Sequence, residues 1–193
     1  MTIPRLTLVL GGARSGKSRH AEHLVQSQSP PWVYVATAEA YDDEMRERIA
    51  LHRTRRPAGW ETAEAPLALA AAIRRHAGQP VLVDCLTLWL TNTMLAEEDV
   101  AAAIDDLVAA ACEATGPLVL VSNEVGFGIV PDNALARRFR DHAGVLHQRL
   151  AVQADRVVLM VAGLPLTVKD GCTPRTVPDL GTDNDATMDR NDR

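Results

Sequence analysis

Residues 6–18 of this chain read LTLVLGGARSGKS, and this stretch decides the fold. The apolar run Leu6–Leu10 predicts a buried strand, which the following glycines end, and helix-forming residues begin at Lys17. The segment fits the pattern G-x-x-x-x-G-K-[S/T], in which backbone amides and a helix N-terminus surround a phosphate group. We therefore predict a nucleotide phosphate site. Its residues are Gly11, Gly12, Ala13, Arg14, Ser15, Gly16, Lys17 and Ser18.

Three side chains in or near this loop suit triphosphate chemistry. Lys17 can neutralise terminal phosphate oxygens, and Ser18 can ligate Mg²⁺. Asp84 ends another apolar run, Val81–Asp84, and a carboxylate at a strand end beside the glycine loop is typical of a magnesium-associated acid. An aspartate in this position can also cap a following helix, so both interpretations of Asp84 stay open.

The rest of the chain alternates short apolar runs with helical segments, which indicates an α/β fold. These runs do not alternate apolar and polar residues, as is typical of strands in a parallel sheet covered on both faces. Besides Leu6–Leu10, the expected strands are Trp32–Thr37, Trp60–Glu64, Val81–Asp84, Pro117–Ser122, Arg156–Val161 and a hairpin return at Leu166–Lys169. The expected helices span residues 17–28, 43–56, 66–77, 99–114 and 133–153.

Length and composition indicate one globular domain. The chain has 193 residues, 47% of them hydrophobic, and we expect a single domain over residues 1–169. From residue 170 the sequence loses its apolar periodicity, so residues 170–193 are expected to form a flexible tail.

Charge and cysteine usage narrow the class of protein. The formal net charge of −5 argues against a general electrostatic grip on nucleic acid. Three widely spaced cysteines fit neither a disulfide framework nor a zinc site, which favours a reducing, cytoplasmic setting. The apolar run near the amino end is too short to span a membrane and lacks the layout of a signal peptide.

The expected helix over 43–56 carries a histidine among arginines. Arg48, Arg55 and Arg56 lie about one turn from His52 on the helix surface. Cationic neighbours favour a neutral imidazole, which is a usable nucleophile near pH 7, and the arginines could hold the phosphates of the group that it attacks. A solvated charged helix with an incidental histidine is the alternative on residue types alone. Surface or packing roles are expected for the other histidines, which are His20, His23, His76, His142 and His147.

Four long segments, at residues 11–22, 33–66, 81–92 and 121–169, together resemble the bifunctional adenosylcobinamide kinase/adenosylcobinamide-phosphate guanylyltransferase family. The resemblance covers about residues 5–169. It implies a P-loop NTPase fold of the recombinase-like type, and Mg²⁺ with ATP or GTP. It also implies two reactions: phosphorylation of adenosylcobinamide, then transfer of GMP from GTP to adenosylcobinamide phosphate through a guanylyl-histidine.

The same resemblance assigns roles to individual residues. The family's R-I-x-x-H-x-x-x-R-P segment falls on Arg48–Pro57, which makes His52 the nucleophile. Further nucleotide contacts are implied at Ala36, Thr37, Ala38, Arg53, Thr54, Arg55, Arg56 and Glu64, with Asp84 near the metal. The family forms homo-oligomers, trimers among them, and the apolar positions Phe127, Ile129 and 88–90 could belong to an interface or to the core.

Glu124 lies in a glycine-containing loop after an expected strand. It could be an acid–base group, a second magnesium partner, or a cap of the helix beginning near Asp132.

Two functions are rivals of the one that the resemblance implies: a small-molecule kinase without guanylyl transfer, and a nucleotide-dependent switch. The first would transfer phosphate without forming covalent GMP, and the second would bind a macromolecular partner.

Overall fold

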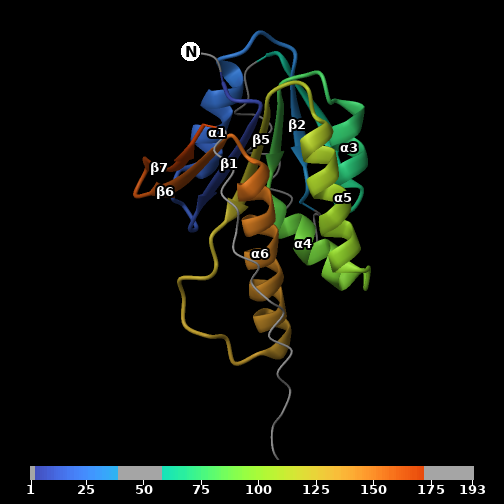
Figure 1. Ribbon diagram of the computed structural model, residues 1–193, viewed down its shortest axis with the longest axis vertical. Helices are drawn as coiled ribbons and strands as arrows, with labels where there is room; N and C mark the ends of the chain where they lie inside the picture. Colours follow the sequence, from blue (N-terminus) through green and yellow to red (C-terminus); the bar gives the residue numbers. More distant parts are fainter. Residues whose placement is uncertain (1–2, 39–57, 172–193) are drawn as a thin grey trace, which may run out of the picture.

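The structure is a computed structural model that describes residues 3–38 and 58–171. Its centre is a seven-stranded sheet with the order β3-β2-β4-β5-β1-β6-β7 (Figure 1). The pairings between neighbours from β3 to β6 are parallel, and β7 runs antiparallel to β6. The strands are β1 (Leu6–Gly11), β2 (Trp32–Ala36), β3 (Trp60–Glu64), β4 (Val81–Asp84), β5 (Leu118–Asn123), β6 (Arg156–Val161) and β7 (Leu164–Asp170).

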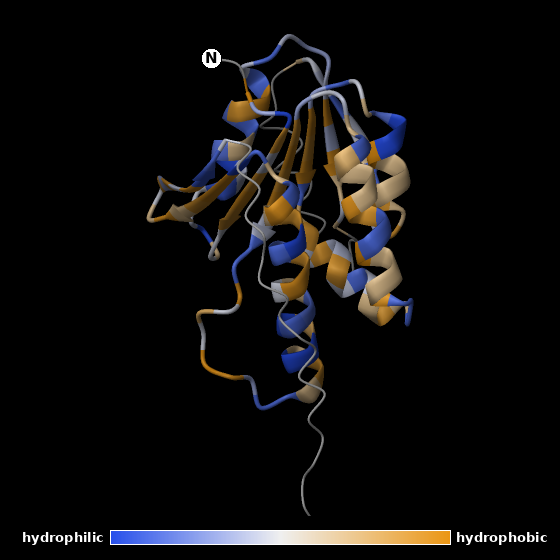
Figure 2. Ribbon diagram, in the orientation of Figure 1, coloured by the Kyte–Doolittle hydropathy of each residue, from blue (hydrophilic) through white to orange (hydrophobic). Residues whose placement is uncertain are grey.

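Helices cover both faces of the sheet, which explains why its central strands are mostly apolar and do not alternate apolar with polar residues (Figure 2). The helices are α1 (Lys17–Gln26), α3 (Leu69–Arg75), α4 (Leu86–Leu95), α5 (Val100–Glu113) and α6 (Ala134–Gln153). On one face Val9 of β1 packs in a cluster with Val25 of α1. On the other face Leu8 shares a larger core with residues of α3, α4, α5 and α6. The predicted α/β class with a mostly parallel sheet is thereby confirmed.

The predicted strands are found within one or two residues of their expected bounds, but α4 was missing from the expected helices. Its sequence, LTLWLTNTML, is apolar on nearly all sides, so it lacks the periodicity that marks an amphipathic helix. The helix lies inside the protein, where Leu86, Trp89 and Leu90 are buried. The helix expected over 43–56 falls outside the described residues, as do residues 172–193 of the expected tail.

The hairpin of β6 and β7 reaches one residue past the predicted end of the domain, because Asp170 is part of β7. The Arg156 guanidinium donates from Nε and an NH2 nitrogen to the two Asp170 carboxylate oxygens, at 3.1 and 3.2 Å. This paired contact across the hairpin holds Asp170 in β7, although the local composition predicted that Asp170 belongs to the tail.

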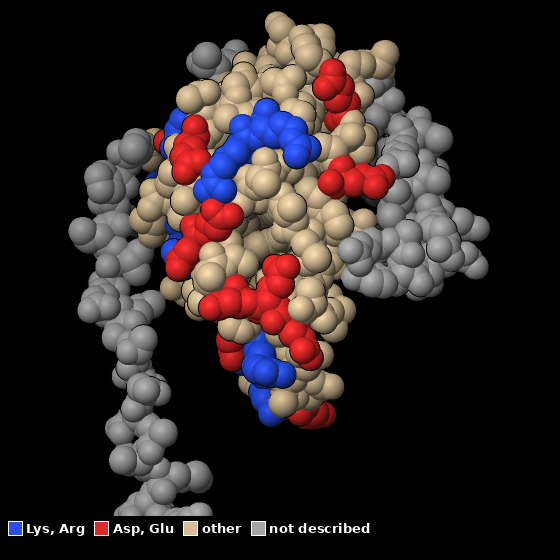
Figure 3. Space-filling view, turned by 90° about the vertical axis from the view of Figure 1, so that its right-hand side faces the viewer, with Lys and Arg blue, Asp and Glu red and all other residues tan. Residues whose placement is uncertain are grey.

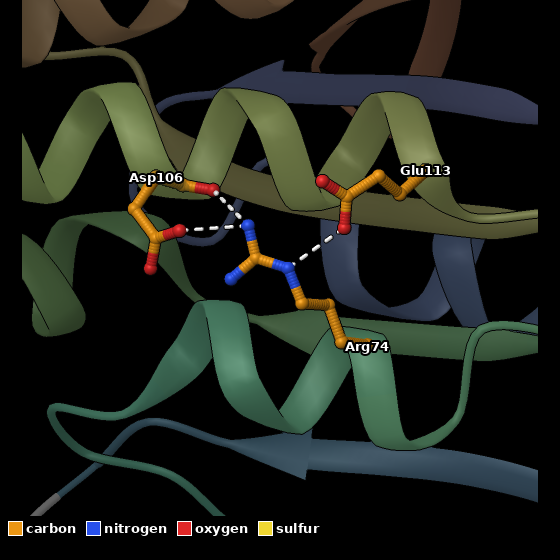
Figure 4. Close-up of polar contacts among 3 residues, drawn as sticks. All are labelled: Arg74, Asp106 and Glu113. Carbon is orange, nitrogen blue, oxygen red and sulfur yellow. Dashed lines mark hydrogen bonds and ion pairs between the residues drawn. The ribbon is translucent and has the colours of Figure 1, made fainter.

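Arg74 joins α3 to α5 near the amino ends of the strands. Its Nε donates to Glu113 Oε2 at 2.7 Å, and an NH2 nitrogen lies 2.7 Å from Asp106 Oδ1 (Figure 4). Acidic and basic side chains are interspersed over the face that carries these two helices (Figure 3). Because all three side chains are substantially exposed, the pairs contribute little to stability, and Arg74 offers a control position away from the carboxyl ends of the strands.

Within residues 3–38 and 58–171, no helix is both long enough and apolar enough to cross a bilayer.

Candidate nucleotide site

The carboxyl ends of the parallel strands bring the predicted site residues to one edge of the sheet. Ala36 at the end of β2 is paired in register with Glu64 of β3 on one side and with Asp84 of β4 on the other. Gly11 at the end of β1 is paired with Asn123 of β5. Strand β5 lies between β1 and β4, so it separates the glycine loop from Asp84 by one strand. In open α/β sheets, ligands bind at this edge. The edge therefore joins the loop, Asp84, Ala36 and Glu64, which are far apart in sequence.

The glycine loop connects β1 directly to α1. At Gly11 an added Cβ would lie 2.5 Å from Ser15 Oγ and 2.9 Å from the Met160 carbonyl oxygen, so only glycine fits there. Gly16, the residue before α1, has a left-handed backbone with φ of 91°, which other residues adopt only with strain. Close packing thus requires glycine at position 11, and the left-handed backbone favours glycine at position 16.

The beginning of α1 is suited to hold phosphate. Within residues 3–38 and 58–171, no side chain caps this helix, and its first turn contains no acidic residue. Its first amides are therefore available to an anion. Lys17 is only 9% exposed, and its ammonium donates to the Gly12 carbonyl oxygen at 3.1 Å, which holds the charge over the loop. Ser15 Oγ is buried and finds no hydrogen-bond partner among the described residues.

Asp84 does not cap the helix after it, so the capping alternative is wrong. The N-cap of α4 is Cys85, and no described side chain makes a capping bond there. Instead, one oxygen of Asp84 accepts a hydrogen bond from the Tyr34 hydroxyl at 3.2 Å. Tyr34 is buried and packs edge-on against Trp60, with ring centroids 6.2 Å apart. Strand β2 thereby orients the carboxylate at the end of β4.

The donor set at this edge fits magnesium, with the Ser18 hydroxyl and the Asp84 carboxylate as candidate ligands. Among the described residues there is no cluster of three or more histidine, cysteine or acidic side chains that could hold a metal alone. Mg²⁺ usually needs only one or two protein carboxylates, because nucleotide phosphates and water complete its octahedron. A shared metal–nucleotide site is therefore the arrangement that these residues suit.

The other expected nucleotide contacts differ in their surroundings. Thr37 is fully buried, and its hydroxyl accepts from the Cys85 amide and donates to the Cys85 carbonyl, both at 2.8 Å. The side chain of Thr37 thus joins the end of β2 to the start of α4. Glu64 is exposed at the end of β3. Contacts from Ala36, Thr37, Ala38 and Glu64 to a nucleotide remain predictions, and His52, Arg53, Thr54, Arg55 and Arg56 lie outside the described residues.

Two features of this edge were not predicted. Nothing in the sequence marks Tyr34 as a partner of Asp84, because the two residues lie 50 positions apart. Glu124 does not cap α6, since Asn133 does so by accepting from the amides of Leu135 and Ala136. Instead, the amide of Glu124 donates to the Gly11 carbonyl at 3.0 Å, which places Glu124 beside the glycine loop.

The tyrosine hydroxyl can be tested alone, because Tyr34→Phe keeps the ring that packs against Trp60. Loss of one hydrogen bond to a charged group should weaken the apparent affinity for Mg²⁺ in nucleotide turnover by roughly 3- to 30-fold. Magnesium titrations of the initial rate measure the effect. An unchanged magnesium dependence in a normally folded variant would contradict the orienting role.

Comparisons with known proteins identify the family of this chain. The family model of cobinamide kinase / cobinamide phosphate guanyltransferase matches residues 7–168. The bifunctional adenosylcobalamin biosynthesis protein CobP of Pseudomonas aeruginosa is 51% identical, over 84% of this chain and 96% of its own length. The CobU proteins of Salmonella typhimurium and Escherichia coli are 45% and 41% identical, each over 85% of this chain and 99% of their own. The chain therefore belongs to the cobinamide kinase / cobinamide phosphate guanyltransferase family.

Proposed function

We propose that this protein is a bifunctional enzyme of cobalamin biosynthesis. It phosphorylates adenosylcobinamide with ATP or GTP, and it then transfers GMP from GTP to adenosylcobinamide phosphate, giving adenosylcobinamide-GDP. The observation that carries the proposal is the glycine loop with its buried lysine, at the same edge of the sheet as Asp84, in a chain that the family model spans from residue 7 to residue 168.

In the kinase reaction the protein acts mainly by positioning. The amides of the glycine loop and the ammonium of Lys17 hold the terminal phosphates and stabilise the charge that develops on them. Ser18 and Asp84 would hold Mg²⁺, which would neutralise further charge on the phosphates. Tyr34 keeps Asp84 oriented for this role.

In the guanylyl reaction His52 is the proposed nucleophile. A neutral imidazole attacks the α-phosphorus of GTP, pyrophosphate leaves, and a phosphoramidate between His52 and GMP remains. The arginines at positions 53, 55 and 56 would stabilise the phosphate charge. Since the kinase reaction needs the γ-phosphate instead, either GTP binds in two registers or the segment bearing His52 moves relative to the loop.

Labelled nucleotides test both activities. With GTP labelled at the α-phosphate, the purified protein should become covalently labelled, in a bond that is stable to base and labile to acid. Adenosylcobinamide phosphate should then discharge the label into adenosylcobinamide-GDP. Transfer of a γ-phosphate to adenosylcobinamide without covalent GMP would indicate a kinase alone. A macromolecular partner released by GTP, without corrinoid turnover, would indicate a nucleotide switch.

We also propose that the enzyme is a homo-oligomer, a trimer according to the resemblance, and that it works in the cytoplasm. The loop between β5 and α6 extends away from the sheet (Figure 1). In this loop Phe127 is 83% exposed to solvent and Ile129 is 97% exposed. Exposed apolar side chains of this size favour contact with another subunit. In contrast, Trp89 and Leu90 belong to the core. Analytical ultracentrifugation of the purified enzyme measures the subunit count.

A further inference from the structure

Three polar side chains form a partly buried chain between α6 and the end of β5. His147 of α6 lies in contact with Ser122 of β5, with 2.7 Å between Nε2 and Oγ. On its other side, His147 Nδ1 lies 3.9 Å from Glu124 Oε2. Ser122 is fully buried, and the side chains of His147 and Glu124 are 9% and 18% exposed. The roles proposed above for the loop, Asp84 and His52 do not use this chain.

The surroundings of His147 decide where its proton lies. Burial lowers the pKa of His147, and the nearby Glu124 carboxylate opposes that shift with a smaller effect, so the ring is neutral near pH 7. An ionised carboxylate repels a nitrogen lone pair, so the favoured tautomer has its proton on Nδ1, toward Glu124. The Ser122 hydroxyl then donates to Nε2. The Nδ1–H group points toward Glu124 Oε2. At 3.9 Å the two atoms are too far apart for a hydrogen bond, so they interact only electrostatically.

Glu124 is held from three directions. Its amide donates to the Gly11 carbonyl at 3.0 Å, and its Oε1 accepts from the Gly126 amide. A Cβ at Gly126 would lie 2.9 Å from Oε1, so a larger residue there would shift the carboxylate from this position. Oε2 faces His147. The backbone contact places Glu124 beside the glycine loop, and the Gly126 hydrogen bond orients its carboxylate, which is 18% exposed and so partly open to a ligand.

The topology places this carboxylate beside the glycine loop. Because β5 lies between β1 and β4, the first residue after β5 has the glycine loop on one side and the strand of Asp84 on the other. Terminal phosphates held by Lys17 and an alcohol that attacks them would meet at this edge of the sheet. Glu124 follows the strand that lies between the strand of the glycine loop and the strand of Asp84.

We propose that Glu124 accepts the proton of the corrinoid hydroxyl in the kinase reaction and that His147 is a positioning residue that orients it. This inference rests on the kinase activity proposed above. The hydroxyl oxygen forms a bond to the γ-phosphorus, the bond from that phosphorus to the β–γ bridging oxygen breaks, and ADP or GDP leaves. The hydroxyl proton passes to the Glu124 carboxylate. His147 keeps its own proton throughout.

Glu124→Gln tests the proton acceptor, because the amide oxygen can still accept from the Gly126 amide. We expect kcat of adenosylcobinamide phosphorylation to fall by about 10²- to 10⁴-fold, while the KM values for adenosylcobinamide and Mg²⁺ change by less than about threefold. Covalent labelling by GTP should persist. A kcat near that of the wild type would overturn the proposal. A raised magnesium requirement with little change in saturated kcat would also overturn it, since a metal ligand would behave in that way.

Two substitutions of His147 separate positioning from packing. The amide nitrogen of His147→Asn can replace Nδ1–H, whereas the amide of His147→Gln can replace Nε2 and keep the contact with Ser122. We expect phosphorylation near the wild-type kcat for His147→Asn and a kcat roughly 3- to 10-fold lower for His147→Gln at unchanged KM. Equal rates, or a faster His147→Gln enzyme, would overturn the positioning role. A wild-type enzyme without kinase activity would instead refute the proposed function.

Discussion

Lys17→Ala should abolish most nucleotide chemistry in this enzyme. We expect kcat/KM for adenosylcobinamide phosphorylation to fall by at least about 100-fold, because the only ammonium in the glycine loop is removed from the developing charge on the terminal phosphates. Burial strengthens the effect, since a charge that is 9% exposed acts on phosphate with little screening by solvent. Guanylylation of the protein should fall as well if the same pocket holds GTP for both reactions.

Arg74→Ala is a matched control for the loss of a basic side chain. Its contacts with Asp106 and Glu113 lie on α3 and α5, away from the carboxyl ends of the strands (Figure 4). We expect its thermal midpoint to fall by no more than about 4 °C and its kinetics to stay at wild-type values. Nucleotide binding and turnover by Lys17→Ala near the wild-type level would contradict the assignment of the phosphate site.

His52→Ala should eliminate covalent GMP without eliminating the kinase. We expect guanylyl transfer to fall by at least about 10³-fold, since the proposed nucleophile for the α-phosphorus is removed. Phosphorylation of adenosylcobinamide should stay within about threefold of the wild-type rate, because the glycine loop and Asp84 remain intact. The two measurements are the acid-labile label from α-labelled GTP and the transfer of label from γ-labelled ATP.

His23→Ala is the control for loss of a histidine, since His23 lies exposed in the last turn of α1. It should leave both activities unchanged. If His52→Ala still traps labelled GMP, the nucleophile is a different residue. If phosphorylation falls together with guanylylation, the segment around His52 holds the nucleotide for both reactions.

The phosphate loop could be predicted because its signal is local. Residues 6–18 combine an apolar strand, glycines with special backbone requirements and a helix start, and the structure has the loop between β1 and α1 where the pattern expects it. Periodicity could not distinguish α4 from a buried strand or loop, because its polar residues Thr87, Asn92 and Thr93 are buried together with leucines of the same helix and no exposed polar face marks a helix.

Contacts between distant segments could not be predicted in the same way. Asp84 had two possible roles, and only the packing of β2 against β4 shows that Tyr34 holds its carboxylate. A surface or packing role was predicted for His147, and the residue is indeed buried. Its contacts with Ser122 and Glu124 could not be predicted, because they depend on how α6 packs against β5.

By itself, the sequence determined the chemistry of the amino-terminal loop, the alternation of strands and helices, and the family resemblance, because each depends on residue types at short, fixed spacings. Only the tertiary structure decided which apolar side chains form the core and which stay exposed, and how Asp84 and Glu124 are oriented. Those outcomes depend on the sheet order and on helix packing, which join residues many positions apart through contacts that no local pattern encodes.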